Sequence, residues 1–257
     1  MLLEKWYLDA VFPDGTVWIG YRARLRLFGC LPISWCAGCE IPPVGAQRKV
    51  TRWKNLPAPC LADGAWNWTG PEGFDGRWLP SVAGVKRTLA SDDRLRIHWN
   101  CIAPRAVVER KDGIRGTTRG VGYLECLRVE SARLGFPFRD LWWGHACAGQ
   151  SSLVWLRWGD GRDLSLLLED GVPTDGRFDT LADGGVSIWT ARNRWETAPG
   201  RTLCNGDLRR SFPAWLVWLT GGMAPAQELK IAGSVRHTTA PGIESAGTGV
   251  WEKVRWA

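Results

Sequence analysis

Several residue types and motifs are scarce in this sequence, and each scarcity removes a class of function. Only 3 histidines occur, and none has a second histidine at the close spacing of a metal-binding element. No Gly-x-Gly-x-x-Gly or Walker loop opens a helical pattern, and the Gly-x-Ser-x-Gly motif is missing. We therefore expect neither a nucleotide cofactor nor serine hydrolase chemistry.

Charge is also thinly spread along the chain. The net charge is +7, yet no block of five or more like charges occurs, and no apolar run reaches the roughly 18 residues of a membrane helix. This pattern favours a solvated basic surface and no nucleic-acid partner, while loose peripheral association with a membrane is compatible with it. Without a visible secretory signal, we expect a cytoplasmic protein whose 8 cysteines are free thiols.

One cysteine pattern needs a separate test for zinc. Cys36-Ala37-Gly38-Cys39 has the spacing of a zinc knuckle. Cys30 and Cys60 do not supply a second knuckle at the usual spacing, so no metal site is expected.

The chain is rich in tryptophan and glycine, and apolar and polar residues often alternate with a period of two. The chain has 18 tryptophans, which build wide apolar walls that each carry one N–H donor. Apolar and polar residues alternate over Val17–Leu27, as in a half-buried strand, and Pro13-Asp14-Gly15 has hairpin-turn chemistry. No long amphipathic helix is visible, so the sequence predicts an all-β fold of antiparallel strands that close into barrels.

The chain also repeats itself. Gly120–Val129 and Gly247–Trp256 both read Gly-x-Gly-x-x-Glu-x-aliphatic-Arg, and Trp6 aligns with Trp143 at a slightly larger offset. Several such matches in one order indicate an internal duplication. We expect two fused barrels or sandwiches, with domains over residues 1–135 and 136–257 and a greasy interior in each.

Four segments resemble the carotenoid hydratase (hydroxyneurosporene synthase) family, whose members have a duplicated lipocalin-like architecture. They are Trp6–Ala10, Trp99–Val108, Gly122–Glu125 and Phe136–Gly144, in the family's order. The resemblance implies an aromatic-lined pocket for a polyene end, an acid that protonates an alkene carbon, and water that captures the cation. Related folds cyclise prenyl chains, accelerate cycloadditions or have no known activity.

The sequence departs from that family at two positions. The family's acid is typically Asp, whereas this chain has Glu125, whose extra methylene displaces the carboxyl group. The family also has a His two residues before the Trp that matches Trp99, where this chain has Ile97 and then His98. Because one step along a strand reverses the face, either a bulge returns His98 to the pocket or its role is lost.

Glu125 is the first candidate catalytic residue, with Tyr123 and His98 beside it. Tyr123, Glu125 and Leu127 share a strand face, and if that face lines the barrel interior, burial raises the pKa of the Glu125 carboxyl. A neutral carboxylic acid can then act as general acid, with Tyr123 as its hydrogen-bond partner. The alternative is a structural glutamate, since Glu252 occupies the same place in the second half.

The other candidates are substrate-binding residues. Trp99 and Trp6 are expected to stabilise a carbocation with their ring faces, although core packing explains most tryptophans. Asp9 holds other groups in place or acts as a second carboxylate. The remaining candidates of the substrate-binding set are Tyr7, Trp142, Trp143 and His145.

These residues predict an enzyme, either a lyase (hydratase) or an isomerase/cyclase. It would act without a cofactor on a hydrophobic isoprenoid or polyene, starting hydration, cyclisation or isomerisation of a double bond by protonation. Two alternatives remain open. One is a lipid- or polyene-binding protein without catalysis, and the other is a pericyclase that only folds a linear polyene.

Overall fold

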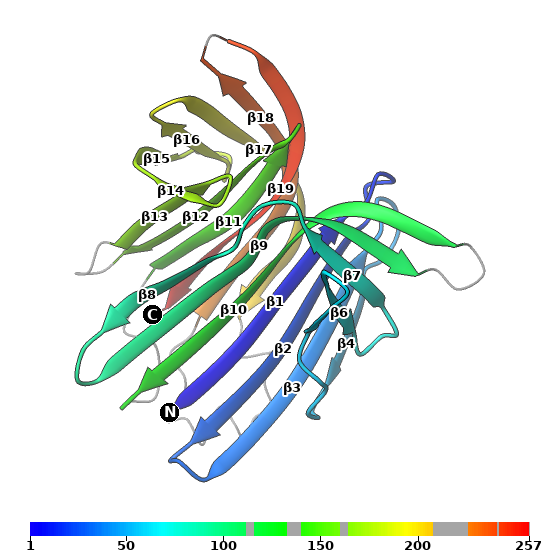
Figure 1. The fold of residues 1–257 in the computed structure, drawn as a ribbon, viewed down its shortest axis with the longest axis vertical. Helices are drawn as coiled ribbons and strands as arrows, with labels where there is room; N and C mark the ends of the chain where they lie inside the picture. Colours follow the sequence, from blue (N-terminus) through cyan, green and yellow to red (C-terminus); the bar gives the residue numbers. More distant parts are fainter. Residues whose placement is uncertain (112–115, 133–139, 160–163, 208–225, 241, 257) are drawn as a thin grey trace. The chain divides into compact units, whose positions relative to one another are not determined.

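The computed structural model describes residues 1–111, 116–132, 140–159, 164–207, 226–240 and 242–256. The chain divides into two compact units, Met1–Arg133 and Leu134–Ala257. All the regular elements of the described residues are β-strands, and each unit forms one antiparallel sheet (Figure 1). The prediction of an all-β chain with two related lipocalin-like halves is confirmed. The expected boundary between residues 135 and 136 lies outside the described residues.

The first unit is a sheet in the strand order β4-β3-β2-β1-β10-β9-β7-β6-β5, with β8 paired to β9. Its strands within the described residues are β1 (Leu2–Val11), β2 (Val17–Leu27), β3 (Leu31–Ile41), β4 (Arg48–Arg52), β5 (Cys60–Ala62), β6 (Ala65–Thr69), β7 (Asp75–Pro80), β8 (Val85–Ser91), β9 (Leu95–Lys111) and β10 (Thr117–Ser131).

The second unit repeats this order as β14-β13-β12-β11-β19-β18-β17-β16-β15. Its strands within the described residues are β11 (Asp140–Ala148), β12 (Ser151–Gly159), β13 (Leu164–Glu169), β14 (Val172–Thr174), β15 (Gly176–Thr180), β16 (Val186–Thr190), β17 (Asn193–Asp207), β18 (Ala226–Thr239) and β19 (Glu244–Trp256). Thus β11, β12, β18 and β19 correspond to β1, β2, β9 and β10.

Local sequence explains the tight hairpins. At Asp63-Gly64 and at Asp170-Gly171, both residues of the turn have positive φ. Two consecutive residues of this kind make the type I′ turn, whose twist matches that of the flanking strands, and Asp-Gly is among its preferred sequences. The hairpins β5–β6 and β13–β14 are therefore specified by two residues each.

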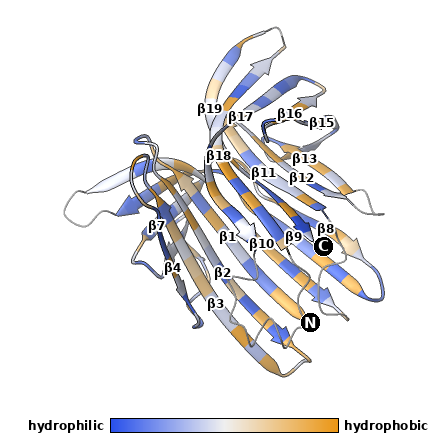
Figure 2. Ribbon diagram, turned by 180° about the vertical axis from the view of Figure 1, so that it is seen from behind, coloured by the Kyte–Doolittle hydropathy of each residue, from blue (hydrophilic) through white to orange (hydrophobic). Residues whose placement is uncertain are grey.

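An aromatic cluster fills the interior of the first sheet. Trp18 of β2 stacks on Phe74 with ring centroids 3.8 Å apart, and it contacts Trp78 of β7 at 5.7 Å. Since β1, β10 and β9 stand between β2 and β7 in the sheet, these contacts require the sheet to curl around its apolar face. Hydrophobic and hydrophilic residues alternate along its strands (Figure 2).

The second unit has its own aromatic interior. Its cluster includes Trp155, Trp195 and Trp251, all buried. The Trp251 indole donates to the Gly184 carbonyl at 3.0 Å, so a buried N–H has a partner. In both units, buried tryptophans line the apolar interior, as the sequence predicted.

The Gly-x-Gly repeat has the same physical reason in both units. A Cβ on Gly122 would collide with the Asp9 carbonyl oxygen, and a Cβ on Gly249 would meet the carbonyl oxygen of His145. Asp9 and His145 occupy equivalent positions on β1 and β11. The glycines therefore let β10 and β19 pass close to the neighbouring strand.

Strand pairing also corrects the sequence alignment of the two halves. Trp6 pairs with Cys126 on β10, and the equivalent pair in the second unit is Trp142 with Lys253. Trp6 therefore corresponds to Trp142, one residue from the Trp143 that the sequence match indicated. Trp143 instead takes the position of Tyr7.

Candidate functional site

The predicted acid lies on the opposite face of the sheet from the aromatic interior. Leu8 of β1 and Leu124 of β10 are paired and belong to the interior cluster. Their neighbours Tyr7 and Glu125 are also paired, and alternation turns them to the reverse face. This corrects the expectation that the Tyr123–Glu125 face lines the barrel interior. The reverse face is nevertheless buried at this point, with Glu125 only 9% exposed.

Two donors converge on one oxygen of the Glu125 carboxyl group. The Tyr123 hydroxyl donates to Oε2 at 2.7 Å, and the Trp99 indole Nε1 donates to the same oxygen at 2.5 Å. Both donors are buried side chains. The structure thus brings together three residues that the sequence singled out, with Tyr123 in the hydrogen bond expected of it.

Asp9 supports this arrangement through the backbone. Its Oδ1 accepts a hydrogen bond from the Tyr123 amide at 3.1 Å, and its Oδ2 accepts one from the Tyr7 hydroxyl at 2.8 Å. The Tyr7 ring also contacts the Tyr123 ring at 6.1 Å. Of the two roles considered for Asp9, the geometry is that of a residue that holds other groups in place.

Burial keeps the hydroxyl of Tyr123 protonated. Desolvation raises the pKa of Tyr123 well above its ordinary value, and the nearby Cys101 and Glu125 raise it further. A tyrosine in this state is a hydrogen-bond donor at any ordinary pH. It therefore continues to donate to Glu125 whether that carboxyl is neutral or ionised.

Cys101 is a member of the site that the sequence reasoning missed. It pairs with Glu125 across β9 and β10, its thiol hydrogen-bonds the Tyr123 side chain, and burial raises the pKa of the thiol. The signal was present, because Cys101 is two residues beyond Trp99 and so shares its strand face.

His98 and Trp6 do not belong to this group. His98 is exposed, pairs with Arg128 across β10, and lies 3.1 Å from the Thr88 hydroxyl, on the opposite face from Trp99. The bulges of β9 against β10 fall beyond Cys101, so none restores His98 to the site. Trp6 faces the interior, where its ring contacts Trp66 at 5.7 Å. Trp6 and Trp99, both expected to stabilise a carbocation, therefore lie on opposite faces of the sheet.

The remaining candidates lie in the second unit. Trp142 packs against the interior cluster and contacts Phe178, whereas Trp143 and His145 are buried on the reverse face. The rings of Trp143 and His145 are 6.0 Å apart. Trp142 is thus separated by its strand face from the other two.

The second glutamate of the repeat has a different partner. Glu252 pairs with Lys230 across β19 and β18, and its Oε2 lies 2.5 Å from the lysine Nζ. The Lys230 side chain is 3% exposed and also lies 3.6 Å from Glu228. Because Lys230 corresponds to Cys101, the two units place a cation and a neutral thiol at the same position.

We also searched the described residues for a metal site and for a membrane-spanning helix. Among the described residues, no three His, Cys, Asp or Glu side chains are grouped to hold a metal ion. Cys36 and Cys39 lie three residues apart on β3 and so point to opposite faces. No helix within the described segments is long and apolar enough to cross a bilayer.

Comparison with known proteins identifies the fold. No family model matches the chain, and no curated protein matches it in sequence. Among solved structures, CghA with Sch210972 has 12% identity and a TM-score of 0.61, covering 100% of this chain and 89% of that one.

Two further solved structures have the same fold. Kievitone hydratase from Nectria haematococca has 7% identity and a TM-score of 0.58, covering 99% of this chain and 89% of that one. An AttH candidate from Nitrosomonas europaea has 13% identity and a TM-score of 0.57, with coverages of 98% and 91%. This chain is therefore similar in fold, over nearly its whole length, to these three proteins.

Proposed function

We propose that this protein is a cofactor-independent acid/base catalyst in which Glu125 protonates a carbon–carbon double bond of a hydrophobic isoprenoid or polyene. The observation that carries the proposal is the convergence of Tyr123 and Trp99 on a single oxygen of a buried carboxyl group. The reaction would be hydration, or cyclisation or isomerisation of the same bond.

The hydrogen bonds favour one distribution of protons. Tyr123 and Trp99 both donate to Oε2, so this oxygen acts as the acceptor and the neutral acid carries its proton on Oε1. When that proton moves to an alkene carbon, negative charge develops on the carboxylate. The two fixed donors stabilise this charge without reorganisation, which lowers the barrier to proton donation.

The complete cycle balances without a co-reactant other than water. Transfer of the Glu125 proton to one alkene carbon leaves a carbocation on the other and a carboxylate on the enzyme. A water molecule adds to the cation, and the carboxylate removes a proton from it, which regenerates the acid and yields an alcohol. In cyclisation a second double bond attacks the cation instead, and the final proton loss again returns the proton to Glu125.

The similarity in fold is consistent with this chemistry. One of the structural neighbours is a hydratase by name, and another was crystallised with Sch210972. At 7% and 12% identity these neighbours support the fold, and the assignment of a role to Glu125 comes from the contacts described above.

The test compares Glu125→Gln with Glu252→Gln, which removes a carboxyl from the equivalent position of the second unit. Acyclic polyenes such as lycopene are incubated with each protein in deuterated buffer, and products are analysed by mass spectrometry. We expect a deuterated alcohol or a cyclic isomer, formed about 10² to 10⁴ times more slowly by Glu125→Gln. Glu252→Gln should retain turnover in the fraction that folds.

Two outcomes would contradict the proposal. Quenching of tryptophan fluorescence by the polyene without any new product would favour a binding protein. Full turnover in Glu125→Gln, with losses only when tryptophans are substituted, would favour a pericyclase that needs no acid.

A further inference from the structure

The interior face of the first sheet changes character along its strands. Leu8 and Leu124 are paired within the aromatic interior, and Trp6 and Cys126 form the next pair on this face. Beyond them the face becomes charged and exposed. The last row across four strands consists of Arg26 on β2, Leu2 on β1, Glu130 on β10 and Arg96 on β9.

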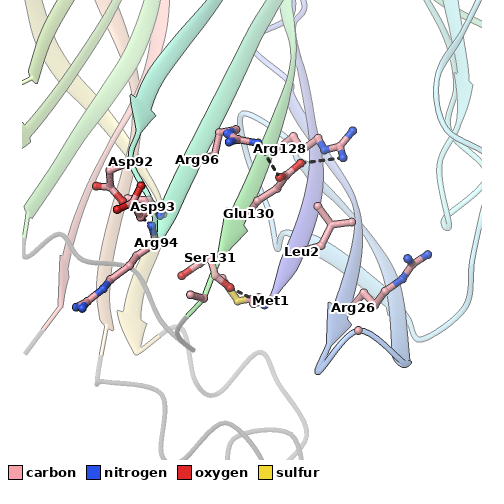
Figure 3. Close-up of a pocket in the computed structure, with 13 residues that line it drawn as sticks. Met1, Leu2, Arg26, Asp92, Asp93, Arg94, Arg96, Arg128, Glu130 and Ser131 are labelled. Carbon is pink, nitrogen blue, oxygen red and sulfur yellow. Dashed lines mark hydrogen bonds and ion pairs between the residues drawn. The ribbon is translucent and has the colours of Figure 1, made fainter.

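A cavity of about 500 Å³ lies at this charged end, entirely within the first unit (Figure 3). Four arginines line it, and they come from three strands and one turn. They are Arg26, Arg94, Arg96 and Arg128. The guanidinium group is a planar donor that binds carboxylate and phosphate through paired hydrogen bonds. The lining therefore has the chemistry of an anion site.

Three acidic residues, Asp92, Asp93 and Glu130, also line the cavity, so its four arginines outnumber its acids by one. Glu130 lies 2.9 Å from Arg128 and 3.8 Å from Arg96, so a single carboxylate serves two arginines. The Asp92 carboxyl accepts hydrogen bonds from the backbone amides of Arg94 and Leu95, which fixes the turn before β9.

Two of the four arginines have no partner among the residues that the structure describes. Within the described residues, no carboxylate or other acceptor contacts the Arg26 or Arg94 side chain. In Figure 3, Arg96 and Arg128 extend toward Glu130, whereas Arg26 stands apart on β2. An added anion thus meets two guanidinium groups without a carboxylate partner among the described residues and two that share a single acid.

The size of the cavity limits the kind of occupant. Small-molecule sites usually have volumes of about 300 to 1,000 Å³, so the volume fits a compact ligand. Met1 and Leu2 also line the cavity. It therefore offers arginines to a charged group and aliphatic side chains to an apolar tail.

We propose that this cavity binds a small anionic amphiphile, held by its phosphate or carboxylate group on Arg26 and Arg128. The site lies on the reverse side of the sheet from Glu125 and is independent of the reaction proposed above. Its existence does not depend on whether Glu125 is catalytic.

Calorimetric titration of the whole protein with decyl phosphate, below its micelle concentration, tests this proposal. Arg26→Gln combined with Arg128→Gln should weaken binding about tenfold or more, because two charge-assisted contacts are lost. Glu130→Gln should tighten binding, because it removes the competing carboxylate. Arg87→Gln combined with Arg236→Gln removes two exposed arginines elsewhere and should change binding less than about twofold.

Two further titrants separate the sources of the anion. Weak but measurable binding of inorganic phosphate at the same arginines supports recognition of the head group. Binding to phosphatidylglycerol vesicles alone, with none to monomeric decyl phosphate, would overturn the proposal in favour of a membrane surface. Equal losses in the Arg26/Arg128 and Arg87/Arg236 variants would also overturn it, because they would indicate nonspecific charge attraction.

Discussion

Glu125 and Glu252 occupy the same position in the two units, yet their surroundings differ. Glu125 accepts hydrogen bonds from Tyr123 and Trp99 and faces the Cys101 thiol. Glu252 faces Lys230 in a buried ion pair. A duplicated residue therefore does not imply a duplicated role, because the cross-strand neighbour decides whether the carboxyl group is neutralised by a cation.

The same comparison explains why the fold tolerates Cys101 opposite one glutamate and Lys230 opposite the other. The backbone requirement, the Gly-x-Gly close approach, is retained in both units. The side chains on the reverse face are free to diverge, provided that each buried polar group finds a partner. The glutamate of the first unit accepts two side-chain hydrogen bonds, and that of the second unit forms an ion pair with Lys230.

The largest expected effect concerns the ion pair. Lys230→Met should lower the free energy of unfolding by about 3 to 5 kcal/mol, because it leaves the Glu252 carboxylate buried without its cation. Urea denaturation followed by circular dichroism measures the loss. Adding Glu252→Gln to Lys230→Met should recover part of it. If the single variant is as stable as the original protein, the ion pair does not have the role described here.

Alanine at either glycine of this pair should destabilise the unit that contains it. Gly122→Ala and Gly249→Ala each place a methyl group against a carbonyl oxygen of the neighbouring strand. We expect each to cost about 1 to 3 kcal/mol of stability, as overpacking of a filled site does. Thermal denaturation of both variants is the measurement. A large loss in only one unit would show that the repeat is not structurally equivalent at this point.

Substitution of Trp99 and of Trp6 should affect the turnover rate differently. Trp99→Phe removes the N–H donor to Glu125 and should slow turnover about tenfold or more, since a donor to developing charge is lost. Trp6→Phe acts on the opposite face and should leave turnover nearly unchanged. Equal effects on the rate constant kcat would argue against the two-face description.

The smallest effect concerns the interior carboxylate of each unit. Glu72 accepts a hydrogen bond from Trp18, while its Oε2 is buried and has no partner within the described residues. Glu169 instead accepts hydrogen bonds from Trp195, Asn193 and Thr190. Removing the negative charge should therefore raise the stability of the protein at Glu72 and lower it at Glu169.

Burial raises the pKa of Glu72, with the Trp18 hydrogen bond acting against the shift. The folded state then binds this proton more tightly than the unfolded state, so stability falls as pH rises from the unfolded pKa through the folded one. Glu72→Gln should flatten this dependence and modestly raise the melting temperature at pH 8, whereas Glu169→Gln should lower it. Melting curves at pH 5 and pH 8 decide, and an unchanged pH profile in Glu72→Gln would contradict the assignment.

The sequence predicted part of the site because strand periodicity is local. The spacing of two between Tyr123 and Glu125 correctly indicated that they share a face and hydrogen-bond. Trp99 was found through a resemblance, and its contact with Glu125 depends on pairing between β9 and β10. The spacing of two places Cys101 on the strand face of Trp99, but its position opposite Glu125 depends on the same pairing.

The arginine cavity was hidden for a related reason. Its arginines are scattered from Arg26 to Arg128 along the chain and form no charge block. Antiparallel pairing brings Arg26, Glu130 and Arg96 into one row across β2, β1, β10 and β9. A chain without a block of like charges can therefore still bring four arginines to one cavity.

The sequence by itself determined the all-β class, the duplication and the identity of the residues that share each strand face, because these follow from a period of two and from repeated glycines. Only the tertiary structure decided which face of the first sheet became its apolar interior and which residue stands opposite each glutamate. Those choices depend on the curl of the sheet and on pairing between strands distant in sequence, and no local pattern contains either.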